Sequence, residues 1–127
     1  HLVSHAHTFT GTVTRVIDGD TIIVGTNRVR LAEIDAPEMK TEFGPVAKQA
    51  LEQMIEGKTV LVEWTRRGRY GRIIGTVFAG KRNICRYLVA KGFARRYART
   101  QKQSVVAALE AKATQANRGL WHLTGAW

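Results

Sequence analysis

Cysteine is nearly absent from the sequence, and this excludes several kinds of site. Cys85 is the only cysteine among 127 residues, so no disulfide can form within the chain. No Cys-x-x-Cys or His-Glu-x-x-His motif occurs, which leaves a zinc site without support. Three of the four histidines (His1, His5 and His7) fall in the first seven residues, and no Ser-His-Asp or Cys-His set is evident. A hydrolase that forms a covalent intermediate is therefore not indicated.

Long apolar runs and acidic residues are also scarce. No apolar run approaches the roughly 20 residues needed to cross a bilayer. No basic amphipathic helix has the apolar face needed to lie on a membrane, so we expect no membrane partner. Ten Asp and Glu stand against twenty Lys and Arg, which gives a formal net charge of +10. That charge predicts attraction to polyanions, with nucleic acid first among them.

The few acids are crowded into one region. Between residues 18 and 42 lie six of the ten: Asp18, Asp20, Glu33, Asp35, Glu38 and Glu42. Residues 64–109 contain no acid but hold twelve bases: Arg66, Arg67, Arg69, Arg72, Lys81, Arg82, Arg86, Lys91, Arg95, Arg96, Arg99 and Lys102. Charge alone leaves two readings open, a solvated basic face beside an ordinary acidic loop, or a polyanion-binding surface with a metal-binding acidic spot.

Alternation of polar and apolar residues predicts five strands, over 8–17, 21–24, 28–34, 58–64 and 72–79. The pair Asp18-Gly19 predicts a tight turn between the first two. In the third strand Val29, Leu31 and Ile34 are expected to point inwards, which places Arg28 and Arg30 on the opposite face.

Helical spacing predicts three helices, over 45–57, 84–91 and 105–117. Pro45 suits a first helical position, and Asn83 and Ser104 suit N-caps. In the first helix the apolar face is expected to comprise Val46, Ala50, Leu51, Met54 and Ile55. Cys85 is expected to be a small core residue of the second helix.

The order of these elements predicts an α+β domain, a five-stranded OB-fold-type β-barrel with three α-helices. The expected domain covers residues 11–122, between a flexible N-terminal segment, 1–10, and a C-terminal tail, 123–127.

The acidic residues suggest a site for a hard cation. One pair of strands separates Asp18 and Asp20 from Asp35 and Glu38, and it can return the second pair close to the first. Oxygen-only ligands suit Ca²⁺ or Mg²⁺. The spacing is not that of an EF-hand, because position twelve counted from Asp18 is Val29. A plain hairpin turn at Asp18-Gly19 and a helix-capping box formed by Asp35 and Glu38 are the simpler alternatives.

Two arginines suggest phosphate chemistry. A guanidinium group can share the charge that develops on phosphorus during phosphodiester cleavage, and Arg30 and Arg72 are candidates for this role. Tyr70 and Tyr97 lie among basic residues, where an aromatic ring can stack on a nucleotide. Surface positions for both arginines, and half-buried rim positions for both tyrosines, are the alternatives.

Four segments together carry a family resemblance: "IDGDT" at 17–21, "VRLAEIDAPE" at 29–38, "RYGR" at 69–72 and "LVAKGFA" at 88–94. In this order and at these spacings they resemble the staphylococcal nuclease (thermonuclease) family, from about Gly11 to Trp121. The resemblance implies a five-stranded barrel with three helices. It also implies a Ca²⁺-dependent, sugar-nonspecific endonuclease that cleaves DNA and RNA and leaves 3′-phosphate ends, with Mg²⁺ or another divalent cation as the alternative metal.

The resemblance also assigns roles to residues. Asp20, Asp35 and the backbone carbonyl of Ala36 would ligate the metal, and Asp18 would lie close by through water. Glu38 is similar to the proposed general base, and Arg30 and Arg72 to the two arginines that bind the phosphate. By the same resemblance, the residues that contact substrate are Arg69, Tyr70 and Tyr97.

The sequence departs from the family at Gly68, where many relatives have Asp, and an altered loop or substrate preference is expected there. With the start at His1 rather than Met, the resemblance leads us to expect a secreted or periplasmic protein whose signal peptide has been removed. A monomer is expected. The alternative function is a non-catalytic nucleic-acid-binding OB-type module, which would not need the full set of acids and arginines.

Overall fold

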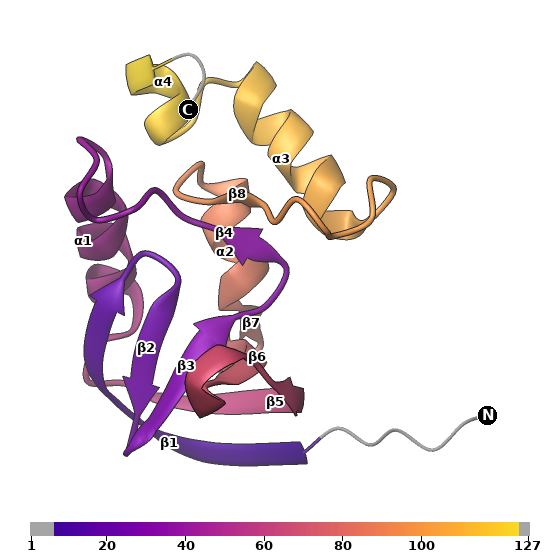
Figure 1. The fold of residues 1–127 in the computed structure, drawn as a ribbon. Helices are drawn as coiled ribbons and strands as arrows, with labels where there is room; N and C mark the ends of the chain where they lie inside the picture. The colour runs from indigo at the N-terminus through magenta and orange to yellow at the C-terminus, as the bar shows by residue number, and fades with distance from the viewer. Residues whose placement is uncertain (1–6, 125–127) are drawn as a thin grey trace.

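The computed structural model describes residues 7–124, and its strands form a barrel beneath a group of helices (Figure 1). The strands are β1 (His7–Asp18), β2 (Thr21–Val24), β3 (Asn27–Leu31), β4 (Ile34–Asp35), β5 (Thr59–Arg67), β6 (Ile73–Ala79), β7 (Arg82–Asn83) and β8 (Arg95–Arg96). The helices are α1 (Gly44–Ile55), α2 (Ile84–Ala90), α3 (Val105–Gln115), α4 (Leu120–Thr124) and a 3₁₀ turn, η1 (Arg69–Gly71).

The main sheet closes on itself. Its strands run in the order β3-β2-β1-β5-β6-β7, and β3 also pairs with β6 in parallel, from Val29 opposite Ile73 to Leu31 opposite Gly75. The five long strands therefore make a closed barrel, which confirms the predicted α+β, OB-like architecture with three main helices. Strand β1 already pairs with β5 at His7, so residues 7–10 of the expected N-terminal segment lie in the sheet.

One predicted strand is two strands in the structure. The strand expected over 28–34 ends at Leu31, and Ala32 and Glu33 form a turn before β4. The backbone of Glu33 has φ 72°, a left-handed conformation that breaks an extended strand. β4 then leaves the barrel and pairs with β8, which the sequence did not predict, because β8 lies some sixty residues further along the chain.

The core fills the barrel and the space under the helices. Val29, Leu31 and Ile34 are fully buried, as predicted, and so is Cys85. Helix α1 buries Ala47, Leu51 and Ile55, which follow one another at four-residue intervals. The prediction that Val46 belongs to this face was wrong: its neighbour Ala47 takes the inward position, and Val46 is 37% exposed.

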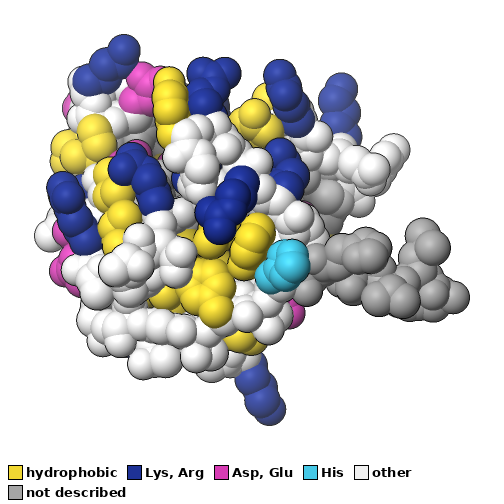
Figure 2. All heavy atoms as spheres, turned by 60° about the horizontal axis from the view of Figure 1, so that its bottom comes forward, with side chains coloured by type: hydrophobic (Ala, Val, Ile, Leu, Met, Phe, Trp, Pro, Cys, Tyr) yellow, Lys and Arg dark blue, Asp and Glu magenta, His cyan; other side chains and the backbone are white. Residues whose placement is uncertain are grey.

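Helices α3 and α4 lie at the end of the molecule opposite β1 and β5, with β4 and β8 between (Figure 1). The predicted caps of α2 and α3 are confirmed: the Asn83 side chain accepts from Arg86 N–H, and the Ser104 side chain accepts from Ala107 N–H. The segment 116–119 makes a turn, and Leu120 N–H then donates to Gly92 O at 2.9 Å. Among the described helices, none is long and apolar enough to cross a membrane. On the face shown in Figure 2, most of the basic side chains lie in the upper half of the view.

Candidate active site

The turn between β1 and β2 carries the first acids of the site. Asp20 N–H donates to Asp18 Oδ1 at 3.1 Å, so the two acids are tied to each other across Gly19. Gly19 does not have a positive φ. Its lack of a side chain matters for another reason, since a Cβ there would lie 2.7 Å from Ala36 Cβ and 2.9 Å from Ala47 Cβ. Glycine therefore lets the acidic turn pack against the segment after β4.

Asp20 is one of the few buried polar residues, with 9% of its surface exposed. Its carboxylate accepts from Thr21 Oγ1 at 3.2 Å and from Ala36 N–H at 2.9 Å. Burial raises the pKa of Asp20 from 3.8 to about 6, while the Arg30 charge and the Ala36 N–H act in the opposite direction. The site thus contains a carboxyl group whose negative charge is only partly compensated.

Arg30, on β3, joins the acids of two elements. Its Nη2 lies 3.4 Å from Asp20 Oδ2 and 3.5 Å from Asp35 Oδ1, and its Nη1 donates to Leu31 O at 2.7 Å. Asp35 is also 3.9 Å from Nη2 of Arg95, which β8 brings alongside β4. The predicted return of Asp35 towards the first turn is therefore observed, with Arg30 between the two carboxylates.

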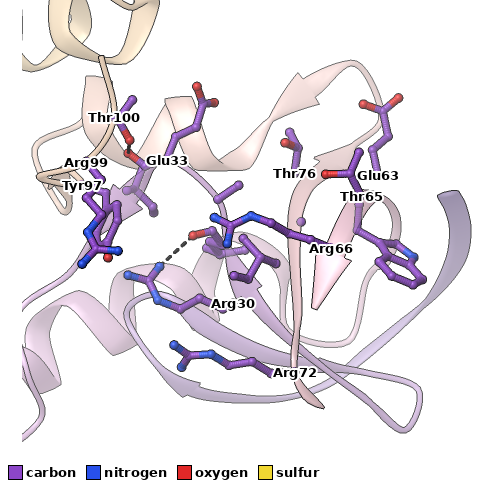
Figure 3. Close-up of a pocket in the computed structure, with 16 residues that line it drawn as sticks. Arg30, Glu33, Glu63, Thr65, Arg66, Arg72, Thr76, Tyr97, Arg99 and Thr100 are labelled. Atoms are coloured by element: carbon purple, nitrogen blue, oxygen red, sulfur yellow. Dashed lines mark hydrogen bonds between the residues drawn. The ribbon is translucent and has the colours of Figure 1, made fainter. Parts of the chain in front are cut away.

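A cavity of about 480 Å³ opens beside Arg30 (Figure 3). Arg72 lines it together with Arg30, and Arg72 Nε is buried without a hydrogen-bond partner in the part of the chain that the structure describes. The ring of Tyr97, another lining residue, has its centroid 6.0 Å from Arg30 Cζ. A cavity walled by guanidinium groups and an aromatic ring can accept a phosphate and the nucleotide attached to it.

Sequence comparison with known proteins points to a nuclease family. The model of the family described as "Staphylococcal nuclease homologue" matches residues 28–123. The chain belongs to the staphylococcal nuclease family. It is 40% identical to an "Uncharacterized endonuclease" of Escherichia coli, over 87% of this chain and 76% of that protein. It is 37% identical to a "Micrococcal nuclease" of Shigella flexneri, over 89% of this chain and 74% of that protein.

A longer relative shares the same domain. The chain is 35% identical to the "Staphylococcal-like nuclease CAN1" of Arabidopsis thaliana, over 74% of this chain but only 29% of that protein. The staphylococcal nuclease domain therefore occurs both in proteins near this chain in length and as part of larger ones.

Of the residues predicted for this staphylococcal nuclease domain, Arg30, Arg72 and Tyr97 line the cavity. The metal-ligand candidates Asp18, Asp20, Asp35 and Ala36 do not line it, and Asp20 and Asp35 are connected to it through Arg30. Glu38 is exposed, and its Oε2 is 3.5 Å from Lys40 Nζ. Arg69 and Tyr70 belong to η1 and do not line the cavity; Tyr70 is 92% exposed, with φ 63°. The fold thus joins Asp18, Asp20, Asp35 and Ala36 to one another and to Arg30, and it places Arg72 and Tyr97 on the cavity that Arg30 also lines. It leaves Glu38, Arg69 and Tyr70 on the surface.

Several residues at the site were not predicted. Arg66 and Arg99 line the cavity, and Arg95 pairs with Asp35. All three belong to the acid-free basic stretch, so their charge was visible in the sequence. Nothing local distinguished them from the other bases of that stretch, because their approach to Arg30 depends on barrel closure and on the β4–β8 pairing.

Proposed function

We propose that this protein is a metal-dependent, sugar-nonspecific endonuclease that hydrolyses phosphodiester bonds of DNA and RNA and leaves 3′-phosphate ends. The observation that carries the proposal is the position of Arg30, whose guanidinium contacts Asp20 and Asp35 and also lines the cavity that Arg72 shares. The names of its relatives, an endonuclease and a micrococcal nuclease among them, support the same reaction class.

Arg30 and Arg72 would bind the phosphate that is cleaved. Arg30 is held by Asp20, Asp35 and the Leu31 carbonyl, so its guanidinium is oriented before substrate arrives. Arg72 lines the same cavity, so its guanidinium group can bind a phosphate held there. A guanidinium held as Arg30 is held stabilises the charge that grows on the phosphate oxygens as water attacks in line with the leaving group.

The acids beside Arg30 fit a hard divalent cation. The Asp20 carboxylate is buried with a raised pKa, and a cation would offset the cost of its negative charge. Within residues 7–124 no three His, Cys, Asp or Glu side chains gather as a metal cluster. The ion would therefore have two carboxylates as direct ligands, those of Asp20 and Asp35. The Ala36 carbonyl, Asp18 through water, and further water would complete its coordination. We infer Ca²⁺, with Mg²⁺ as the alternative. When bound, the cation supplies positive charge that favours the transition state.

Glu38 would accept the proton of the attacking water. Its carboxylate is 3.5 Å from the ammonium group of Lys40 on the surface, and such exposed pairs contribute little stability. Turning Glu38 towards bound substrate would therefore cost little. The change Glu38→Gln keeps the size of the side chain and removes the base, so we expect an intact fold and a loss of about 10²–10⁴ in rate.

The test is cleavage of plasmid DNA and of a structured RNA with Ca²⁺, with Mg²⁺ and with chelator, at one salt concentration. Glu38→Gln is purified in parallel, so that a contaminating nuclease would show as activity common to both preparations. The proposal requires metal-dependent cleavage that the variant loses, with 3′-phosphate ends on the products. Near-wild-type cleavage by Glu38→Gln would remove this residue from the role of base.

The second candidate is a nucleic-acid-binding module without catalysis, which the formal net charge of +10 favours. Retarded migration of the nucleic acid, with no cleavage under any metal condition, would establish that function instead.

A further inference from the structure

The cavity contains more positive charge than one phosphate needs. Four arginines line it: Arg30, Arg66, Arg72 and Arg99. The Arg30 side chain is paired with Asp20 and Asp35, whereas the side chains of Arg66 and Arg99 make no ion pair or hydrogen bond within residues 7–124. Cations that face one space without acidic partners repel one another, and a bound polyanion relieves that repulsion.

The acids on the cavity wall do not neutralise these arginines. Glu33 Oε1 lies 3.8 Å from Nε of Arg86, which is not a lining residue. Glu63 extends from β5 at the upper right of Figure 3, whereas Arg66, Arg72 and Arg99 lie around Arg30 at the centre and left of that view. The excess positive charge therefore faces the space beside Arg30.

The arginines come from different walls. Arg66 lies on β5, Arg72 immediately precedes β6, and Arg99 lies in the connection between β8 and α3. A single phosphate held by Arg30 and Arg72 would leave the other two groups without a ligand. We propose that Arg66 and Arg99 form a subsite for the phosphates that flank the cleaved one, with Tyr97 as a stacking surface for a base between them. This inference rests on the proposed function.

The wall that carries Arg99 is fastened to the rest of the site. The carbonyl of Glu33 accepts from Tyr97 N–H at 2.9 Å and from Thr100 Oγ1 at 3.2 Å. Thr100 N–H donates in turn to Tyr97 O at 2.8 Å. The residues on both sides of Arg99 are thus bonded to the turn between β3 and β4, which keeps Arg99 at the cavity wall. Because this backbone is already fixed, less conformational entropy is lost there when a strand binds.

The experiment compares a short oligothymidylate with a dinucleoside monophosphate, which has no flanking phosphates. Both are cleaved by wild type, Arg66→Gln and Arg99→Gln, and by Arg28→Gln as a charge-matched control. Arg28 is exposed on β3 and lies outside the cavity. For Arg66→Gln and Arg99→Gln we expect kcat/KM on the oligomer to fall about tenfold or more. The ratio of oligomer to dinucleoside kcat/KM is expected to fall with it, whereas Arg28→Gln preserves the ratio.

Binding gives an independent readout. With chelator present, the affinity of each subsite variant for labelled oligothymidylate is expected to depend less steeply on salt, with a slope smaller by about 1. If kcat/KM fell equally on both substrates, so that the ratio stayed unchanged, the subsite would be overturned while the nuclease proposal stayed intact. If wild type cleaved neither substrate, the proposed function would fail, and the binding measurement alone would test the subsite. In that case, affinity and salt slope equal to those of wild type in both variants would overturn the subsite.

Discussion

At the scale of single residues, Asp20 shows how one carboxyl group serves both fold and site. Its position is set by the packing of Gly19 against Ala36 and Ala47 and by the hydrogen bond from Ala36 N–H. The same packing removes the carboxyl group from water, which is why its pKa rises although Arg30 lies within 3.4 Å. A group in this state couples the stability of the protein to pH.

Without a divalent cation, Asp20 should make wild type lose stability as the pH rises. Its pKa is about 6 in the folded protein and about 3.9 in an unfolded chain. The folded state thus binds the proton more tightly, and the resulting stabilisation is present below about pH 4 and lost as the pH rises through about 6. The difference in unfolding free energy, wild type minus Asp20→Asn, should fall by up to about 3 kcal/mol over this range. Urea unfolding of both proteins at several pH values, with chelator present, measures this difference. Unfolding free energies that vary with pH in parallel in the two proteins would contradict a raised pKa at Asp20.

Arg30→Lys tests whether a fixed guanidinium, and not positive charge alone, is needed. Lysine keeps the charge but has one nitrogen, so it cannot contact Asp20, Asp35 and the Leu31 carbonyl and still present a donor to phosphate. We expect a loss of about 10²–10³ in kcat with a cooperative unfolding transition retained. Arg28→Lys, on the exposed part of the same strand, is the matched control. Comparable activity in the two variants would show that Arg30 acts only through its charge.

At the scale of elements, the connection after β8 depends on an arginine whose side chain folds back onto the backbone of that connection. Arg96 Nη1 donates to three backbone carbonyls, those of Tyr97 at 3.4 Å, Ala98 at 3.3 Å and Thr100 at 2.6 Å. The backbone N–H of Arg96 donates to Oε2 of Glu110, on α3, at 2.6 Å. Although Arg96 belongs to the basic stretch, these bonds hold the backbone of the connection that carries Tyr97.

Arg96→Gln should therefore loosen this connection. The loss of the carbonyl contacts should destabilise the protein by roughly 1–3 kcal/mol and raise KM for an oligonucleotide more than it lowers kcat. Hydrogen exchange at the Tyr97 amide, which is bonded to Glu33 O, should accelerate. Lys102→Gln removes a charge from an exposed position in the same connection and serves as the control. A change in kcat alone, with unchanged exchange, would mean that Arg96 acts on the reaction directly.

The elements that sequence predicted well are those whose causes are local. Asn83 and Ser104 cap helices through bonds three residues away, and alternation around Val29 fixes which face of β3 is buried. The turn at Glu33 was missed because a left-handed glutamate has no reliable local signal. Asp20, Arg30 and Asp35 were predicted as site residues because they lie in short sequence motifs. Arg66 and Arg99 were missed as site residues because only the tertiary fold separates them from other bases in the stretch.

At the scale of the whole molecule, barrel closure joins distant parts of the chain into one core. The parallel pairing of β3 with β6 brings residues 29–31 beside residues 73–75, and α2 packs on β6. Cys85 lies at this junction: it is fully buried, and its Sγ is 3.9 Å from Gly75 O. Its reactivity consequently reports on whether helix and barrel separate.

Cys85 should be alkylated only when the protein unfolds as a unit. Burial raises the pKa of the Cys85 thiol to about 11, so in the folded state it is neither accessible nor ionised near neutral pH. We expect almost no reaction with iodoacetamide in native buffer and complete reaction in concentrated guanidinium chloride. The native-state rate should follow the free energy of global unfolding as urea is added. Lys81→Cys in a Cys85→Ser background, with its thiol on an exposed turn, should react rapidly and calibrates the reagent. Rapid labelling of wild type with little dependence on urea would instead mean that α2 opens while the barrel, and with it the site around Arg30, stays closed.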